Sequence, residues 1–148
     1  MNLSELTFLF LQTSGFIIGL GAVTVIDLHG FIAQKSEYWT EATTRTHKVT
    51  KPLIWLGTIL LTVGLLMQYV IYPTNVITLI RLLLIVPMFL NGIFLSFSVS
   101  PYLLKREKED RSAEILSTDW QWKIRASFVV SFIGWWSSVL LFVYQIAS

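Results

Sequence analysis

The sequence predicts an all-α, polytopic membrane protein in which four transmembrane helices form one bundle, with both termini on the outer side of the membrane. Of the 148 residues, 54% are hydrophobic and only 14% are charged, against about 25% charged in an ordinary soluble domain. The charged residues also leave four windows without any formal charge, at residues 6–26, 52–80, 82–104 and 126–148. Each window reaches the roughly 20 residues that an α-helix needs to cross the ~30 Å hydrocarbon core.

The first helix is expected over residues 6–31 and is not a cleavable signal peptide. A signal peptide opens with a basic segment, but Glu5 is the only charged residue before the first window, and the apolar stretch exceeds the ~7–15 residues of a signal-peptide core. Gly15 and Gly19 form a GxxxG pair, which lets membrane helices approach closely. This face is expected either to pack inside the bundle or to contact a second copy or a membrane partner.

The second helix is expected over residues 51–72. Pro52 then falls in the first turn, where its missing N–H leaves no bond unmade, and Thr50 is the expected cap. Residues 34–49 mix aromatic and charged side chains, which predicts a separate short helix at the membrane interface. A tight turn follows the second helix, and the third is expected over residues 75–100.

The fourth helix is expected over residues 119–147. The highly charged residues 105–116 favour a helix, so the third helix is expected to continue beyond the membrane after a bend at Pro101. Neither long connection can form a second domain, so residues 1–148 are predicted to be a single transmembrane domain. The chain has no cysteine, which excludes disulfides, thiolate metal sites and thiol redox chemistry.

The basic residues predict the orientation of the bundle. Ten of the eleven Lys and Arg residues lie between the first and second windows or between the third and fourth, and such basic connections mark the cytoplasmic side. We therefore expect a multi-pass protein of the cell membrane with its main charged loops in the cytoplasm. A basic rim of this kind suits an anionic lipid leaflet better than nucleic acid. The lipid bilayer is the expected partner, and nucleic acid is not.

Asp27 and two histidines are candidate functional residues at the inner side of the membrane. An ionisable side chain at membrane depth is costly and is a functional candidate by default. Asp27 is expected either to pair with Lys48 or Lys51 or to act as a proton relay or cation ligand. His29 and His47 flank the first inner connection, where they could bind a haem iron or, with Asp27, a metal ion. No cofactor is otherwise predicted.

Arg81 interrupts the charge-free windows about one and a half turns into the third helix from the outer side. One interpretation is that its long side chain extends outward to the membrane surface. The other is that it turns inward toward Gln12, Gln68 and Gln145, which all fall near the outer leaflet. An arginine among three amides would bind an anion or a polar headgroup.

Asn91 and two tryptophans break the apolar pattern of the last two helices. Asn91 follows Pro87 by four residues, and this combination is typical either of a kink that opens around a ligand or of an interhelical hydrogen bond. Trp135 and Trp136 lie about 18 Å past Lys123, near the middle of the bilayer. They must face different directions, and they either pack against helices and lipid or form a stacking platform for a quinone, porphyrin or lipid.

The sequence leaves the biochemical activity open. It contains no HExxH motif, no phosphate-binding glycine loop and no nucleophile elbow. In size and helix count it resembles small bacterial four-helix membrane families, including a haem-linked protoporphyrinogen-oxidising family and copper-resistance membrane domains. The haem-linked family implies a histidine in the first span, where this chain has Thr13 and Ser14, so no residue role is transferred. We expect a bundle subunit or small-ligand-binding module; the alternatives are a haem- or quinone-linked redox enzyme and a small transporter or ion pathway.

Overall fold

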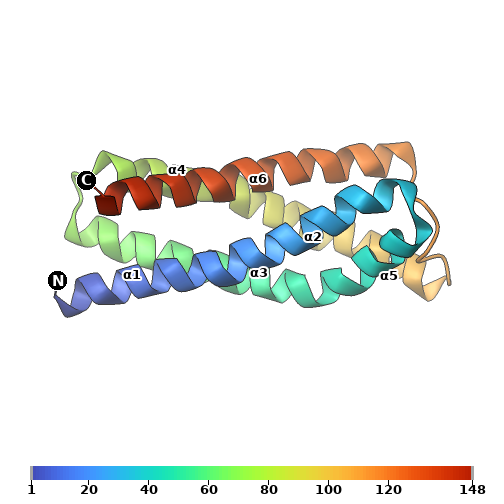
Figure 1. The fold of residues 1–148 in the computed structure, drawn as a ribbon, viewed down its shortest axis with the longest axis horizontal. Helices are drawn as coiled ribbons and strands as arrows, with labels where there is room; N and C mark the ends of the chain where they lie inside the picture. Colours follow the sequence, from blue (N-terminus) through green and yellow to red (C-terminus); the bar gives the residue numbers. More distant parts are fainter. Residues whose placement is uncertain (1, 148) are drawn as a thin grey trace.

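In a computed structural model that describes residues 2–147, four long helical runs lie side by side in one bundle (Figure 1). The runs are Leu3–Lys35, Glu37–Ile71, Val76–Lys108 and Thr118–Ala147. Each is long and apolar enough to cross a membrane. The predicted all-α architecture with four candidate membrane spans is therefore confirmed.

Two of the four runs contain a π-helical turn. The first run consists of α1 (Leu3–Gly15), a π-helical turn (Phe16–Leu20), α2 (Gly21–Ile32) and a 3₁₀ turn (Ala33–Lys35). The third run consists of α4 (Val76–Phe94), a second π-helical turn (Leu95–Val99) and α5 (Ser100–Lys108). The second and fourth runs are the uninterrupted helices α3 (Glu37–Ile71) and α6 (Thr118–Ala147). Such π turns inside α-helices are frequent near functional sites.

The predicted boundary at the start of the second helix is wrong. The segment 34–49 forms no separate interfacial helix; most of it is the first part of α3, which runs through Pro52 without a break. Its cap is Ser36, whose side chain accepts a hydrogen bond from the Trp39 N–H, and Thr50 instead donates to the Thr46 carbonyl. Proline removes one backbone bond, and a long membrane-type helix tolerates that loss where neighbouring groups compensate.

The other helix boundaries follow the expectations more closely. The side chain of Asn75 caps α4 by accepting from the Thr78 N–H, after the tight turn that follows α3. The third run continues only to Lys108, so the expected helical extension is confirmed for residues 105–108 and is wrong for residues 109–116, which form turns and irregular structure. Pro101 lies in the first turn of α5, where a missing N–H is tolerated, and the irregularity falls just before it, in the π turn Leu95–Val99.

Helices α1 and α3 approach each other through glycines. A Cβ on Gly57 would lie 2.5 Å from the backbone nitrogen of Gly19 and 2.8 Å from the carbonyl oxygen of Gly15. Only the absence of side chains allows this approach, which is the role of small residues in membrane-type packing. The Gly15/Gly19 face is thus covered by α3 of the same chain, in agreement with the interpretation of internal packing.

Both chain ends point to one end of the bundle. The beginning of α1, the α3–α4 turn and the end of α6 lie together, and the connections 33–36 and 109–117 lie at the opposite end (Figure 1). We call these the termini end and the charged end. A buried apolar layer lies between them; its members are Phe16, Val23, Leu61, Leu65, Ile85, Met88 and Trp135.

Candidate functional site: a cavity at the charged end

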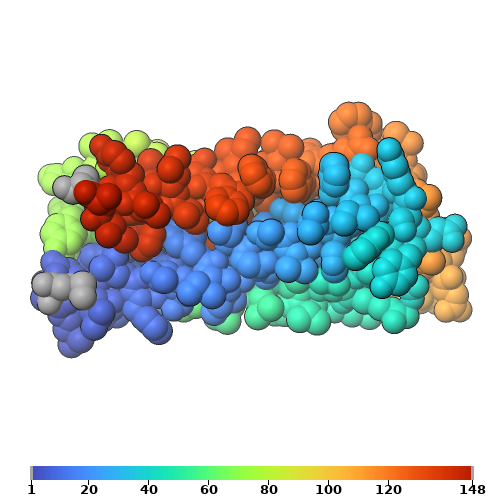
Figure 2. All heavy atoms as spheres, in the orientation of Figure 1, coloured from blue at the N-terminus to red at the C-terminus, as the bar shows by residue number. Residues whose placement is uncertain are grey.

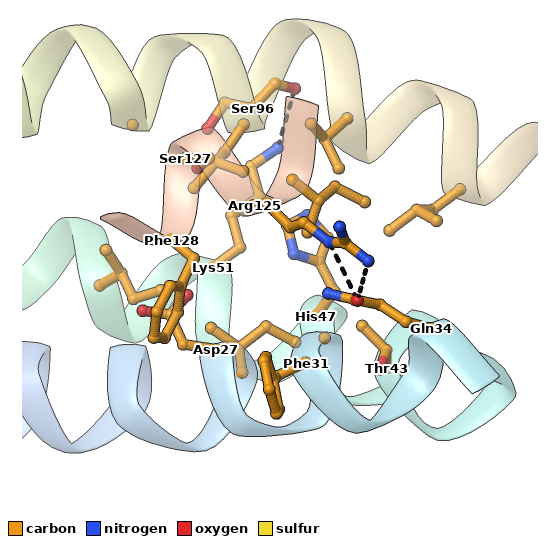
Figure 3. A pocket seen from close by; sticks show the side chains of 18 of the residues that line it. Asp27, Phe31, Gln34, Thr43, His47, Lys51, Ser96, Arg125, Ser127 and Phe128 are labelled. Atoms are coloured by element: carbon orange, nitrogen blue, oxygen red, sulfur yellow. Dashed lines mark hydrogen bonds between the residues drawn. The ribbon is translucent and has the colours of Figure 1, made fainter. Parts of the chain in front are cut away.

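A cavity of about 80 Å³ lies between α2, α3, α6 and the π turn Leu95–Val99, toward the charged end (Figure 3). Its polar lining includes Asp27, Gln34, His47, Lys51 and Arg125. Most of the remaining wall is apolar, with side chains such as those of Ile54, Trp55, Leu103 and Phe128. A largely apolar cavity with a few converging polar groups is the usual form of a small-molecule site.

Asp27 has no hydrogen bond and no ion pair with any residue in the described range 2–147. The two lysines that were expected to pair with it are engaged elsewhere. Lys48 forms an ion pair with Glu107 at 2.7 Å, and the Lys51 ammonium lies 3.5 Å from the Ser96 carbonyl oxygen. The expected Asp27–lysine pair is therefore wrong, and the carboxyl group lines the cavity without a partner among the described residues.

The two cations of the cavity have neutral partners. Arg125 donates from both Nε and Nη2 to the side-chain oxygen of Gln34, at 3.0 and 2.5 Å. Within residues 2–147, Lys51 donates only to the Ser96 carbonyl, in a long bond. His47 is 7% exposed, and its Nε2 is buried without a hydrogen-bond partner among the described residues. The cavity therefore holds hydrogen-bonding groups of both charge signs that do not neutralise one another.

Two further spaces share Asp27 as a lining residue with the cavity. A deeper space reaches Asn91, Ser131 and Trp135 among the helices. A groove of about 320 Å³ runs along the outside between the first helical run and α6, which lie next to each other in Figure 2. Its walls are almost entirely apolar, and Phe31, at 65% exposed, and Trp136, at 47%, also face outward. The polar cavity thus adjoins the apolar outer surface of the bundle.

Asn91 links α4 to α6. Its amide nitrogen donates to the Ser127 carbonyl at 3.1 Å and to the Ser131 hydroxyl at 2.9 Å. This geometry is the interhelical hydrogen bond that was one of its two interpretations. Pro87 stays inside α4. Asn91 also lines the deeper space, so it remains available to a ligand there.

Trp135 and Trp136 face in different directions, as expected. Trp135 is 2% exposed and packs on Gly19, where a Cβ would clash with its ring. Trp136 is exposed on the side of the bundle and lines the groove next to Phe132. Trp135 thus serves the packing of the core, and both indoles border spaces that adjoin Asp27.

The two histidines have different surroundings. His29 lies against Trp39 with ring centroids 5.1 Å apart, whereas His47 lines the cavity. Within residues 2–147, no three His, Asp or Glu side chains are grouped so that they could hold a metal ion. The structure therefore does not combine Asp27, His29 and His47 into a metal site.

The inward orientation of Arg81 is the one that the structure shows. Its Nη2 donates to the Gln12 side-chain oxygen at 2.6 Å and its Nη1 to that of Gln145 at 3.0 Å. Gln12 in turn donates to the Gln68 side-chain oxygen at 3.0 Å, and Gln145 to the Thr78 hydroxyl at 2.8 Å. This network joins α1, α3, α4 and α6 near the termini end, away from the cavity at the charged end.

Sequence reasoning missed the roles of Gln34 and Arg125 in the cavity. Arg125 counted only as part of the basic rim. Gln34 follows Asp27 by seven residues, which places both on one helix face, and this spacing was the available signal. Ser96 carried no such signal, because it takes part through its backbone carbonyl, which lies in the π turn Leu95–Val99 and accepts from Lys51.

Comparison with known proteins identifies no relative. No family model matches the chain, and neither a curated protein nor a solved structure matches it significantly.

Proposed function

We propose that the chain is a multi-pass membrane protein that binds a small amphipathic molecule drawn from the cytoplasmic half of the bilayer. The observation that supports this most is the meeting of three spaces at Asp27: the polar cavity, the deeper space and the outer apolar groove. A molecule with a polar head and an apolar tail matches this combination of a polar cavity and an apolar groove. The positive-inside rule places the charged end in the cytoplasm.

The charges of the cavity favour a head that carries an anionic group. Lys51 and Arg125 now donate to a carbonyl and to an amide oxygen. A carboxylate or phosphate would replace these neutral acceptors with charge-assisted bonds, which are about twice as strong. Asp27, which has no protein partner in the described chain, would accept from a hydroxyl or ammonium group on the same head.

The groove between the first helical run and α6 suits the apolar part of the ligand. Leu28, Phe31, Phe132 and Trp136 form much of its wall and are partly exposed on the outer surface. In a membrane this surface faces lipid tails, so an acyl chain or similar group can enter sideways without crossing water. Burial of aromatic and aliphatic surface in a shaped groove then adds packing contacts that free lipid does not make.

A matched pair of glycine substitutions tests the cavity. A Cβ on Gly30 meets only Ile124 Cγ2, at 3.7 Å, and Gly30 lines the polar cavity. We therefore expect Gly30→Leu to fold and to fill that space. The control is Gly21→Leu in the same helix, because nothing lies within 4 Å of a Cβ there.

The assay measures quenching of tryptophan fluorescence by a stearate that carries a nitroxide on its chain. Trp55 lines the cavity and Trp136 the groove, so bound probe quenches both. We expect saturable quenching in the wild type and in Gly21→Leu, and only linear, non-saturable quenching in Gly30→Leu. Equal quenching of all three proteins would contradict the proposal.

The charge of the head is tested with Arg125→Gln and with the methyl ester of the same probe. We expect the substitution to weaken binding of the acid about tenfold, which corresponds to about 1.4 kcal/mol. Binding of the uncharged ester should not change. An equal loss for acid and ester would show that Arg125 acts through the fold and not through the charge of the head.

Proton-coupled transport is a second candidate, favoured by Asp27. This carboxyl has no partner among residues 2–147 and borders spaces that lead toward the charged end and toward the side of the bundle. Such a group can take up and release a proton as its surroundings change. Proteoliposomes with an entrapped pH dye test this: protein-dependent acidification on addition of the fatty acid, abolished by Asp27→Asn, would favour transport over binding alone.

A further inference from the structure

Arg81 is a fully buried cation without a counter-charge. Its side chain is 0% exposed, and no carboxylate among residues 2–147 forms an ion pair with it. Its hydrogen-bond partners among the described residues are neutral amides, those of Gln12 and Gln145. Removing an ion from water costs several kcal/mol, and neutral acceptors compensate for this only in part. An isolated buried guanidinium therefore calls for a negative partner.

The donors of Arg81 are not all used. A guanidinium has five N–H groups and no acceptor. One bond leaves from Nη1 and one from Nη2, whereas Nε is buried and has no hydrogen-bond partner among the described residues. The rings of Phe142 and Phe16 flank the group, with centroids 4.9 and 5.9 Å from Cζ. An unpaired donor of this kind in a dry site commonly marks an ion or water that completes it.

A vestibule at the termini end leads to this network. It has a volume of about 260 Å³, and Gln68, Phe142 and Gln145 are among its walls. Gln145 both lines the vestibule and binds Arg81, so this side chain links the vestibule to the guanidinium. Glu5 stands at the rim, where it accepts from the Tyr72 hydroxyl; it is only partly buried, so water and salt screen its charge.

We propose that Arg81 binds a small monovalent inorganic anion, such as chloride, which enters from the vestibule and acts as its counter-ion. The surroundings are tight, because Gln12 and Thr78 are also 0% exposed, so a monatomic ion matches this proposal better than a large polyatomic one. This site is independent of the amphiphile site at the charged end and does not rest on that proposal.

The test is the thermal unfolding midpoint of the purified protein in a neutral detergent, with gluconate replaced by chloride at constant ionic strength. A ligand that binds only the folded state raises the midpoint in a saturable way. We expect such a rise in the wild type, a similar one with bromide, and none with sulfate. A midpoint that does not depend on the anion would overturn the proposal.

Gln145→Glu is the decisive variant. Its carboxylate would stand 3.0 Å from Arg81 Nη1 in place of the amide oxygen, and it can accept from the Thr78 hydroxyl where Gln145 now donates. This variant carries its own counter-charge. We expect it to be more stable than the wild type in gluconate and to have lost the chloride response. Gln12→Glu does not serve, because the Gln12 amide must donate to Gln68 and to the Gly64 carbonyl.

Two further measurements keep the test valid where a variant fails to fold. Thr62→Val removes a hydroxyl bonded only to its own helix, at the Thr58 carbonyl, and should keep the chloride response. Equilibrium dialysis of the wild type with radiolabelled chloride should give one bound ion per chain, displaced by bromide and not by gluconate. A Gln145→Glu protein that responds to chloride like the wild type, or a wild type without bound chloride, would overturn the assignment.

Discussion

Replacement of Gly57 by alanine tests how the bundle is held together. Gly57 lies where α3 meets the first helical run, and its missing side chain is what allows the contact. An added Cβ would lie 2.5 Å from Gly19 N and 2.8 Å from Gly15 O. Real Cβ atoms do not approach other heavy atoms so closely, and both neighbours are backbone atoms that cannot rotate away. The two helices must therefore separate along their interface.

The size of the effect follows from two opposing contributions. Extra methyl groups in a packed core destabilise by about 1–3 kcal/mol, whereas alanine is about 1 kcal/mol better than glycine inside a helix. At Gly57 the two contributions together give a net loss of up to about 2 kcal/mol. At Gly21 nothing lies within 4 Å of a Cβ, so Gly21→Ala should gain up to about 1 kcal/mol.

The assay is reversible unfolding in mixed micelles of neutral and denaturing detergent, followed by circular dichroism. The difference between the two variants is the measured quantity, because both exchange the same residue types and errors of the reference state largely cancel. We expect Gly21→Ala to exceed Gly57→Ala in stability by about 1–3 kcal/mol, the steric contribution alone, because the gain in helix propensity is common to both variants. If Gly57→Ala is as stable as Gly21→Ala, then α1 and α3 do not pack through their glycines.

Two further predictions concern aromatic side chains. Trp135 is 2% exposed and Trp136 is 47% exposed. In the same unfolding assay, Trp135→Ala should therefore cost about 3–5 kcal/mol of unfolding free energy, whereas Trp136→Ala should stay within about 0.5 kcal/mol of the wild type. Equal effects of the two substitutions would contradict the assigned faces. The hydrogen bond from the Tyr72 hydroxyl to Glu5 raises the pKa of Tyr72 above its ordinary value. Because the folded-state pKa is raised, the bond stabilises the fold below the ordinary tyrosine pKa, and this stabilisation is lost as the pH rises through the raised value. An ultraviolet titration of the wild type, with the titration of Tyr72→Phe subtracted, should therefore show one tyrosine that loses its proton at unusually high pH. Glu5→Gln should return the pKa of this tyrosine toward its ordinary value.

The spans were predictable from sequence because the positions of the charges define them. A charge-free stretch of 20 or more residues has few alternatives to a membrane-type helix. The boundary at Pro52 was not predictable in the same way. A proline suits both the first turn of a helix and the interior of a long one, and the choice depends on whether neighbouring groups replace the lost bond. That information lies in the tertiary contacts.

The contacts of the polar side chains were likewise predictable only in part. The three amides near Arg81 were identifiable because helix length alone puts them at one depth, but depth does not set the rotation of a helix about its axis. The inward orientation of Arg81 needed the packing of four helices. For Asp27 the sequence indicated two nearby lysines, and both have other partners in the structure. The spacing of residues along the chain sets their depth along the bundle axis, but it does not determine which side chains are in contact.

The two proposed sites should act independently, because a buried apolar layer separates them. Leu61 and Leu65 are 0% exposed in that layer, and Trp135 is 2% exposed. Sites without shared partners usually contribute additively, within about 0.5 kcal/mol. Gly30→Leu should therefore leave the chloride-dependent rise of the unfolding midpoint unchanged, and Gln145→Glu should leave quenching by the nitroxide-labelled stearate unchanged. If either substitution alters the other response more than twofold, the bundle has two arrangements that both ligands bias, as a transporter requires and a simple binding module does not.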